Sequence, residues 1–154
     1  MLVLTFEAGG ERLALDVRSV VEVVPRVRLR PLAGAPSWLS GAFVYRGTVV
    51  PVVDLNQLAG AGECPTHLSS RIILVRKLGP TGERLLGLVV TRVDDVRALE
   101  PASATLDGFT PEGQPDFGPV AVENGELLRR LDLDRILPET YRRLVPTDLR
   151  ELPT

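Results

Sequence analysis

The feature that most constrains the fold is an internal repeat. The segment GERLALDVRSVVEV, residues 10–23, matches GERLLGLVVTRVDDV, residues 82–96, with one inserted residue. The segment GTVVPVVDLNQL, residues 47–58, matches GELLRRLDLDRI, residues 125–136, without a gap. Because self-similar sequence encodes a repeated structural unit, the chain predicts two copies of one supersecondary arrangement.

Within both copies, apolar side chains alternate with other residue types, which is the period of a half-buried strand. This pattern predicts one hairpin over residues 2–17 and another over residues 71–90. A strand at 93–99 and a hairpin turn at the Asn124-Gly125 dipeptide are also expected. Each copy then supplies about five short strands, and such strands commonly close into a small barrel that hides their edges. The predicted fold is all-β, with two small barrels packed together.

The segments between the strands give weaker signals. Arg26, Arg28 and Arg30 alternate with apolar residues, which predicts one solvated face of a strand rather than an anion site. Asp54 is placed to cap a short helix at residues 55–59, because its carboxylate can accept from the free N–H groups of the first turn.

Trp38 lies in a proline-bounded loop and is expected to plug the end of a core. Residues 101–119 are rich in proline, glycine and aspartate and predict a mobile excursion. Residues 133–137 and 139–145 predict helices, and the last residues of the chain predict a frayed end.

Length and composition exclude several classes of protein. The 154 residues fit one domain with a sizeable core. The net charge of −2, with 1 Trp, 2 Tyr and 4 Phe, argues against a nucleic-acid partner. Cys64 has no second cysteine to pair with, so the chain lacks a disulfide framework and fits a reducing compartment. No apolar stretch approaches the roughly 18 residues of a membrane span, so we expect a cytoplasmic protein without direct membrane insertion.

An enzyme would have to use the carboxylates of Asp94, Asp95, Asp132 and Asp134, but the repeat explains these residues as strand ends and helix caps. His67, the single histidine, lies in a loop segment without a nucleophile or acid motif nearby and is expected at the surface. The sequence also lacks a phosphate-binding Gly-rich loop, an HExxH motif and a Ser or Cys nucleophile motif. We therefore expect no catalytic residues, no cofactor and no metal.

Four blocks of the chain resemble the CheW family, the scaffold proteins of bacterial chemotaxis arrays. They are LALDVRSVVEV, WLSGAFVYRGTVVPVVDL, GLVVTRVDDV and LDLDRIL, and the resemblance runs over nearly the whole chain. The second block is the most specific, because a glycine, an Arg-Gly pair, a strand with PVVDL and a short helix stand at fixed mutual distances.

The resemblance implies a single CheW-like domain over residues 1–154, made of two SH3-like five-stranded β-barrels around a shared core. The first half, or barrel, is expected at about 1–60 and the second at about 71–138, followed by a partly helical tail at 139–154. Short helices are expected after strands and near the C-terminus.

The resemblance also implies a function without catalysis. The expected role is an adaptor, sited at membrane-associated receptor arrays, that couples the cytoplasmic tip of methyl-accepting chemoreceptors to the regulatory domain of a CheA-type histidine kinase. The alternative is a divergent member that binds a receptor but not the kinase, or that serves a non-chemotactic chemosensory pathway.

The residues expected to bind a partner are Val20, Glu22, Gly41, Val44, Tyr45 and Arg46. By the resemblance, the groove between the barrels contains Val20, Glu22, Gly41 and Arg46. Gly41 would leave room there for a partner helix. Arg46 stands in a turn, where its planar fork of donors can meet a carboxylate, and Glu22 is the nearest acid in the pattern. A surface pair of this kind contributes only about 0 to 1 kcal/mol, so positioning a binding face is the better reason for it. Val44 and Tyr45 would form an apolar rim.

The chain departs from the family pattern in two places. Family members usually carry Asn-Leu before the Arg-Gly pair, where this chain has Val44 and Tyr45, so the choice of receptor is open. Arg129 and Arg130 replace an apolar strand, and Pro119 removes a ladder donor. Because an unpaired buried guanidinium is costly, we expect an edge position or a carboxylate partner for the inward arginine. This remodelled second barrel is the basis of the alternative in which one partner is lost.

Overall fold

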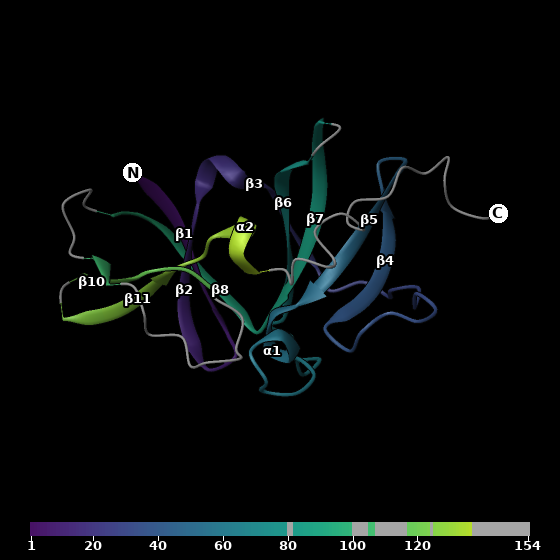
Figure 1. The fold of residues 1–154 in the computed structure, drawn as a ribbon, viewed down its shortest axis with the longest axis horizontal. Coiled ribbons are helices and arrows are strands. Elements are labelled where there is room, and N and C mark those ends of the chain that lie inside the picture. Colours follow the sequence, from purple (N-terminus) through teal and green to yellow (C-terminus); the bar gives the residue numbers. More distant parts are fainter. Residues whose placement is uncertain (80–81, 100–104, 107–116, 124, 137–154) are drawn as a thin grey trace.

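A computed structural model describes residues 1–79, 82–99, 105–106, 117–123 and 125–136, and arranges their strands in two sheets side by side (Figure 1). The six-stranded sheet has the order β8 (Arg92–Ala98), β1 (Leu2–Ala8), β2 (Glu11–Asp16), β11 (Glu126–Arg130), β10 (Val120–Glu123) and β9 (Thr105–Leu106). The five-stranded sheet has the order β3 (Val20–Pro25), β6 (Arg71–Gly79), β7 (Gly82–Val90), β5 (Thr48–Asp54) and β4 (Leu39–Tyr45). The predicted all-β fold is confirmed.

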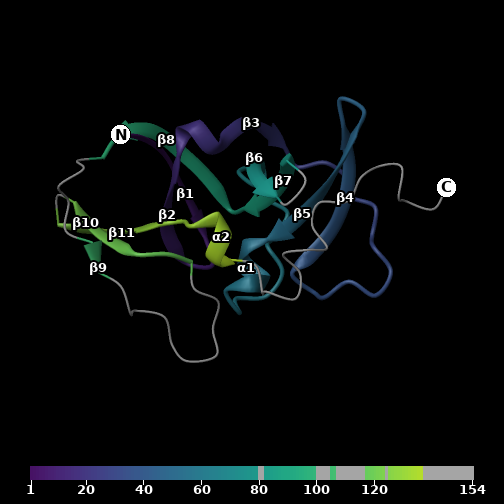
Figure 2. The same cartoon turned by 45° about the horizontal axis from the view of Figure 1, so that its top comes forward.

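The described helices are short: η1 (Val17–Ser19), α1 (Leu55–Leu58) and α2 (Leu133–Ile136). Figures 1 and 2 place α1 and α2 where the two sheets meet, and Leu55, Leu58 and Ile136 are buried in the core between the sheets. None of the helices that the structure describes is long and apolar enough to cross a membrane.

Each sheet combines strands from both halves of the repeat. The six-stranded sheet joins the hairpin β1–β2 to later strands, and the five-stranded sheet joins the hairpin β6–β7 to earlier ones. Four ladders make this exchange. The pairings of β1 with β8 and of β3 with β6 are antiparallel. The other two are parallel, with Val52 of β5 opposite Gly87 of β7 and Arg129 of β11 opposite Leu13 of β2. The ladders therefore cut across the halves at 1–60 and 71–138, because each hairpin pairs its free edge with strands of the other half.

Three clusters of buried apolar side chains follow from this arrangement. We call the largest the shared core, because it takes side chains from both sheets and from α1 and α2. The strand β6 explains why: Ile73 and Val75 face the shared core, while Ile72 and Leu74 face a second cluster on the other side of the five-stranded sheet. Burial on both faces accounts for the unbroken apolar run of this strand. A third, smaller cluster belongs to the six-stranded sheet and comprises Val3, Ala14, Leu99 and Leu128.

The five-stranded sheet is strongly curled. Val21 and Val24 of β3 and Phe43 and Tyr45 of β4 all pack against the second cluster, although these two strands are the outermost ones. Within the described ranges no ladder joins β3 to β4, so closure into a hydrogen-bonded barrel stays a prediction.

Asp54 is the last residue of β5, and its carboxylate caps the first turn of α1. It accepts from the backbone N–H groups of Asn56 at 2.9 Å and Gln57 at 3.2 Å, and its second oxygen accepts from Cys64 N at 2.8 Å. Asp54 is 0% exposed, and its bonds to Asn56 and Cys64 are buried, so they satisfy donors that water cannot reach. In the second copy Asp132 accepts from Asp134 N at 2.9 Å in an exposed setting. The predicted helix caps are confirmed.

The prediction of a solvated strand face at Arg26, Arg28 and Arg30 is wrong. Pro25 ends β3, and within this segment only Arg30 pairs, through an isolated bridge with Ala42. A proline supplies no ladder donor, which favours the end of a strand at this position.

Other expectations can be compared with the described residues. Trp38 packs against the shared core, and His67 is exposed, as predicted. Glu123 pairs with Glu126, which confirms a two-residue hairpin connection between β10 and β11. Most of 101–119, the helix expected at 139–145 and the frayed end lie outside the described residues.

The two caps make a matched pair of tests. Replacing Asp54 with Ala should lower the free energy of unfolding by about 2–4 kcal/mol, because buried backbone donors lose their acceptor. The same change at Asp132 should cost only about 0.5–1 kcal/mol, because water can replace its carboxylate. Urea denaturation of both variants measures the difference, and equal losses would contradict the assigned burial of the first cap.

Candidate partner-binding site

The predicted partner face is built on the hairpin of β4 and β5. Tyr45 pairs with Thr48, so Arg46 and Gly47 form a two-residue turn with φ angles of 48° and 81°. A turn with two positive φ angles matches the twist of the flanking strands, but it favours glycine or asparagine. Among the described residues, Arg46 is the only non-glycine with a positive φ. In the gapless alignment of the repeat its counterpart is Asn124.

Glu22 reaches this hairpin from β3, the opposite end of the five-stranded sheet. The hydroxyl of Tyr45 donates a hydrogen bond to the Glu22 carboxylate, so the contact joins the two outer strands. The structure records no ion pair between Glu22 and Arg46 in the part of the chain that it describes. The Arg46 guanidinium lies over the Tyr45 ring instead, with 5.2 Å between Cζ and the ring centroid, which is a cation–π distance. Three of the six predicted residues therefore converge.

The hydrogen bond also shifts the ionisation of the tyrosine. The bond to Glu22, with a smaller effect of burial, raises the pKa of Tyr45 above its ordinary value of 10.0, and the nearby Arg46 charge opposes the shift. At neutral pH the hydroxyl is therefore protonated and remains a donor.

The other three predicted residues have different surroundings. Val44, 66% exposed, is available to a partner beside Arg46. Val20 is half-buried and packs against the shared core. Gly41 is buried with a φ of 144°, and a Cβ there would collide with the carbonyl oxygen of Arg30. The space left by this glycine is occupied by the chain itself, so a bound helix is not needed to explain it.

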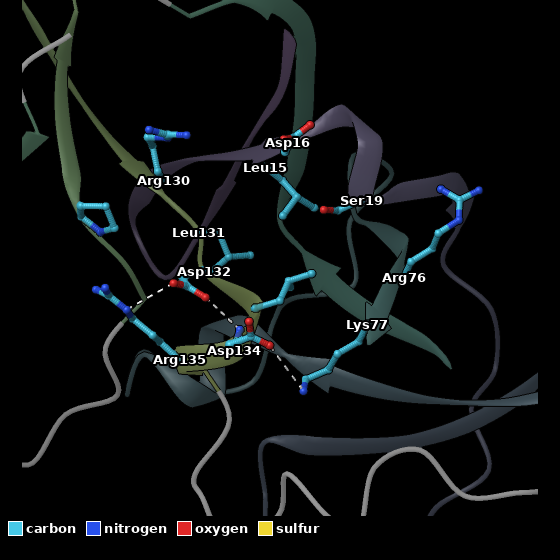
Figure 3. Close-up of a pocket in the computed structure, with 12 residues that line it drawn as sticks. Leu15, Asp16, Ser19, Arg76, Lys77, Arg130, Leu131, Asp132, Asp134 and Arg135 are labelled. Carbon is cyan, nitrogen blue, oxygen red and sulfur yellow. Dashed lines mark hydrogen bonds and ion pairs between the residues drawn. The ribbon is translucent and has the colours of Figure 1, made fainter. Parts of the chain in front are cut away.

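A pocket of about 460 Å³ lies between the two sheets (Figure 3). It is lined from the ends of β2 and η1, from β6, and from the segment that leads from β11 into α2. None of the six predicted residues lines this pocket. Glu22, Tyr45 and Arg46 gather where the curl of the five-stranded sheet brings β3 to β4, and their role in partner binding stays a prediction.

Each carboxylate of the pocket already has a basic neighbour in the chain. Asp16 pairs with Arg18 at 2.8 Å, Asp132 with Arg135 at 3.2 Å, and Asp134 with Lys77 at 3.9 Å. The hydrogen bond from the Arg18 side chain lowers the pKa of Asp16 despite the opposing effect of burial. These acids act as caps and ion-pair partners, and no two of them form an acid–base pair.

Sequence reasoning missed Lys77, whose side chain is only 9% exposed and reaches from β6 toward α2 (Figure 3). The signal was a lysine inside the apolar run of residues 71–78, which marks a side chain that must leave the core to find a carboxylate.

The unusual arginine of β11 has the partner that its burial requires. Arg129 has a side chain 12% exposed, and its Nε lies 2.9 Å from a carboxylate oxygen of Glu11. Its Nη1 donates to the carbonyl of Gly118 at 3.0 Å. The carbonyl of Pro119 still accepts from Arg130 N at 2.8 Å. The expected carboxylate partner is present, and the strand keeps its place between β2 and β10.

Among the residues that the structure describes, no three His, Cys, Asp or Glu side chains are grouped so that they could hold a metal ion. The candidate site itself presents an exposed guanidinium, an exposed apolar neighbour and a tyrosine that joins two strands.

The comparisons with known proteins agree with this fold. A family model described as a CheW-like domain matches residues 2–140. The chain belongs to the CheW-like domain family. This CheW-like protein is 32% identical over 143 residues to Protein FrzA of Myxococcus xanthus, covering 91% of this chain and 87% of that protein. It is 28% identical over 138 residues to the chemotaxis protein CheW of Thermotoga maritima, covering 89% and 87% of the two chains.

A solved structure supports the same assignment. The scaffolding protein TtCheW from Thermoanaerobacter tengcongensis matches this CheW-like protein with a TM-score of 0.73 and 27% sequence identity. The match covers 86% of this chain and 84% of that one.

Two glycines of the partner face separate structural from binding roles. Changing Gly41 to Ala should destabilise this CheW-like protein by more than about 2 kcal/mol, because a strained φ adds to a backbone collision. Changing Gly47 to Ala should cost only about 1 kcal/mol, because its φ is positive but nothing lies within 4 Å of the added Cβ. Thermal unfolding compares them. A stable Gly41→Ala protein that has lost partner binding would instead assign Gly41 to the interface.

Proposed function

We propose that this CheW-like protein is a non-catalytic adaptor in a bacterial chemosensory pathway. It couples the cytoplasmic tip of methyl-accepting chemoreceptors to the regulatory domain of a CheA-type histidine kinase, on the cytoplasmic side of receptor arrays. The observation that carries the proposal is the match of the CheW-like domain model to residues 2–140, nearly the whole chain. Relatives named as chemotaxis and scaffolding proteins support it.

The chemistry of the described residues fits an adaptor better than an enzyme. Asp132 and Asp134 are engaged in ion pairs, and Asp95 accepts a hydrogen bond from the Thr5 hydroxyl at 2.8 Å. General acid–base work needs carboxylates that converge on a substrate, and these acids are distributed as structural partners.

In this proposal the receptor contacts the surface around Arg46. A non-glycine residue in the left-handed region costs roughly 1 kcal/mol or more, and the Arg46 side chain has no described ion pair that offsets this cost. An exposed guanidinium held at a conformational cost is typical of a residue selected for binding rather than for stability. Val44, exposed beside it, offers apolar contact to a bound helix.

The alternative, an adaptor that has lost the kinase, rested on Arg129, Arg130 and Pro119. Arg129 is paired with Glu11, and Pro119 accepts a backbone bond from Arg130, so β11 is not broken by these residues. No described contact favours the alternative, and the proposal keeps both partners.

Binding measurements with the purified protein test the proposal. We expect separate complexes with a kinase regulatory domain and with a receptor tip fragment, and a ternary complex when all three are mixed. Size-exclusion chromatography with light scattering would detect them. Binding to the receptor tip alone would favour the alternative, and binding to neither partner would reject an adaptor role.

Arg46 allows stability and binding to be separated. Changing Arg46 to Asn should raise the free energy of unfolding by up to about 1 kcal/mol, because asparagine tolerates positive φ. The same change should weaken receptor-tip binding by about tenfold or more, the effect of losing one charge-assisted hydrogen bond. Arg46→Glu should weaken binding further with a melting temperature close to that of the wild type. Large loss of stability with intact binding would contradict the role of Arg46.

A further inference from the structure

Tyr45 touches both charged residues of the partner face. Its hydroxyl donates to the carboxylate of Glu22, and its ring lies under the guanidinium of Arg46 at 5.2 Å. The same ring packs against the second apolar cluster, and this packing fixes its position on the five-stranded sheet. One side chain thus determines where an acid and a base of the surface lie.

Through these contacts Glu22 and Arg46 each interact with Tyr45 rather than with each other. Glu22 has the tyrosine hydroxyl as its hydrogen-bond partner, and in the described residues no carboxylate pairs with Arg46. A cation–π contact with the ring uses no N–H donor of the guanidinium, so its planar fork of donors stays available to a partner. Because Arg46 is exposed, this fork faces solvent, where a partner can approach it.

The occupant that fits this surface has one acidic and one apolar side chain close together. The fork of Arg46 matches the two oxygens of a carboxylate, and the exposed Val44 beside it takes an apolar contact. An acidic group would be repelled by Glu22 if that carboxylate were free to swing toward Arg46. The hydrogen bond from Tyr45 prevents this competition.

We infer that Tyr45 is a positioning residue that sets partner specificity: its hydroxyl holds Glu22 away, its ring carries Arg46, and the guanidinium then binds a carboxylate of the receptor tip. The inference rests on the proposed function, because that function supplies the partner. It adds the chemistry that the partner must have and the residue that selects it.

The first test needs no partner. Glu22→Gln and Arg46→Gln should act independently on the unfolding equilibrium when Tyr45 is present. In the Tyr45→Phe background they should become coupled by about twofold to fivefold, the range of an exposed ion pair, because Glu22 then turns to Arg46. Denaturant unfolding of the eight proteins of this cycle measures the coupling. Equal coupling in both backgrounds would overturn the inference.

Tyrosine ionisation gives a second partner-free measurement. Tyr141→Phe removes the other of the 2 tyrosines, so the change in tyrosine absorbance on titration to alkaline pH reports the ionisation of Tyr45 alone. Glu22→Gln should bring the pKa of Tyr45 back toward its ordinary value of 10.0. An unchanged titration would show that the hydroxyl does not engage Glu22 and would overturn the inference.

The third test uses a receptor tip fragment and calorimetric titration. Tyr45→Phe keeps the ring and its packing, yet it should weaken binding by about threefold to tenfold. Adding Glu22→Gln should restore the affinity to within about twofold of the wild type, a rescue that a merely structural role for Tyr45 would not produce. With Arg46→Gln already present, Tyr45→Phe should have no further effect.

The outcomes separate the two hypotheses. If no receptor tip binds the wild-type protein, the proposed function fails and so does the partner assigned here, while the first two tests still decide whether Tyr45 keeps Glu22 from Arg46. If the tip binds but Tyr45→Phe leaves the affinity unchanged, or Glu22→Gln gives no rescue, the proposed function stands and the inference about Tyr45 is overturned.

Discussion

The four pairings between the halves, β8 on β1, β11 on β2, β3 on β6 and β5 on β7, are the constraint on which the rest of the structure depends. Each one joins a strand of one half to a hairpin of the other, so neither half can complete its sheet alone. The shared core follows from the same exchange, because both sheets and both α-helices contribute side chains to it. A partner that binds one sheet therefore binds a domain whose two halves fold cooperatively.

Much of this fold could be predicted because its signals are local. Alternation along the chain gave the strands, and the gapless part of the repeat placed α1 and α2 after equivalent carboxylates, Asp54 and Asp132. What the repeat could not give is which half supplies each strand of a sheet. Hairpin edges of both copies look alike in sequence, and only packing of the apolar faces decides between pairing within a half and pairing between halves.

Features that depend on contacts between distant residues were predicted less well. Arginines alternating with apolar residues at 26–30 suggested a strand, but that segment forms only the bridge from Arg30 to Ala42. For the inward one of Arg129 and Arg130 the sequence predicted an edge position or a carboxylate partner, and it could not name Glu11 as the partner of Arg129. In the candidate site it predicted a pair of Glu22 with Arg46, whereas the described structure pairs each of them with Tyr45. The curl of the sheet, which no local pattern encodes, creates that contact.

The two copies of the repeat differ at the positions of the candidate site. Asp95, the counterpart of Glu22, accepts a hydrogen bond from the hydroxyl of Thr5 on the neighbouring strand β1. This bond supports the ladder between β1 and β8. Glu22 also accepts a hydrogen bond from a hydroxyl, but the donor is Tyr45 at the far edge of the sheet, next to the turn that contains Arg46. Where the second copy has Asn124, a residue suited to that turn, the first copy has an arginine in a strained conformation. Stability favours the asparagine, and this cost of the arginine supports the proposal that Arg46 was selected for recognition of another protein.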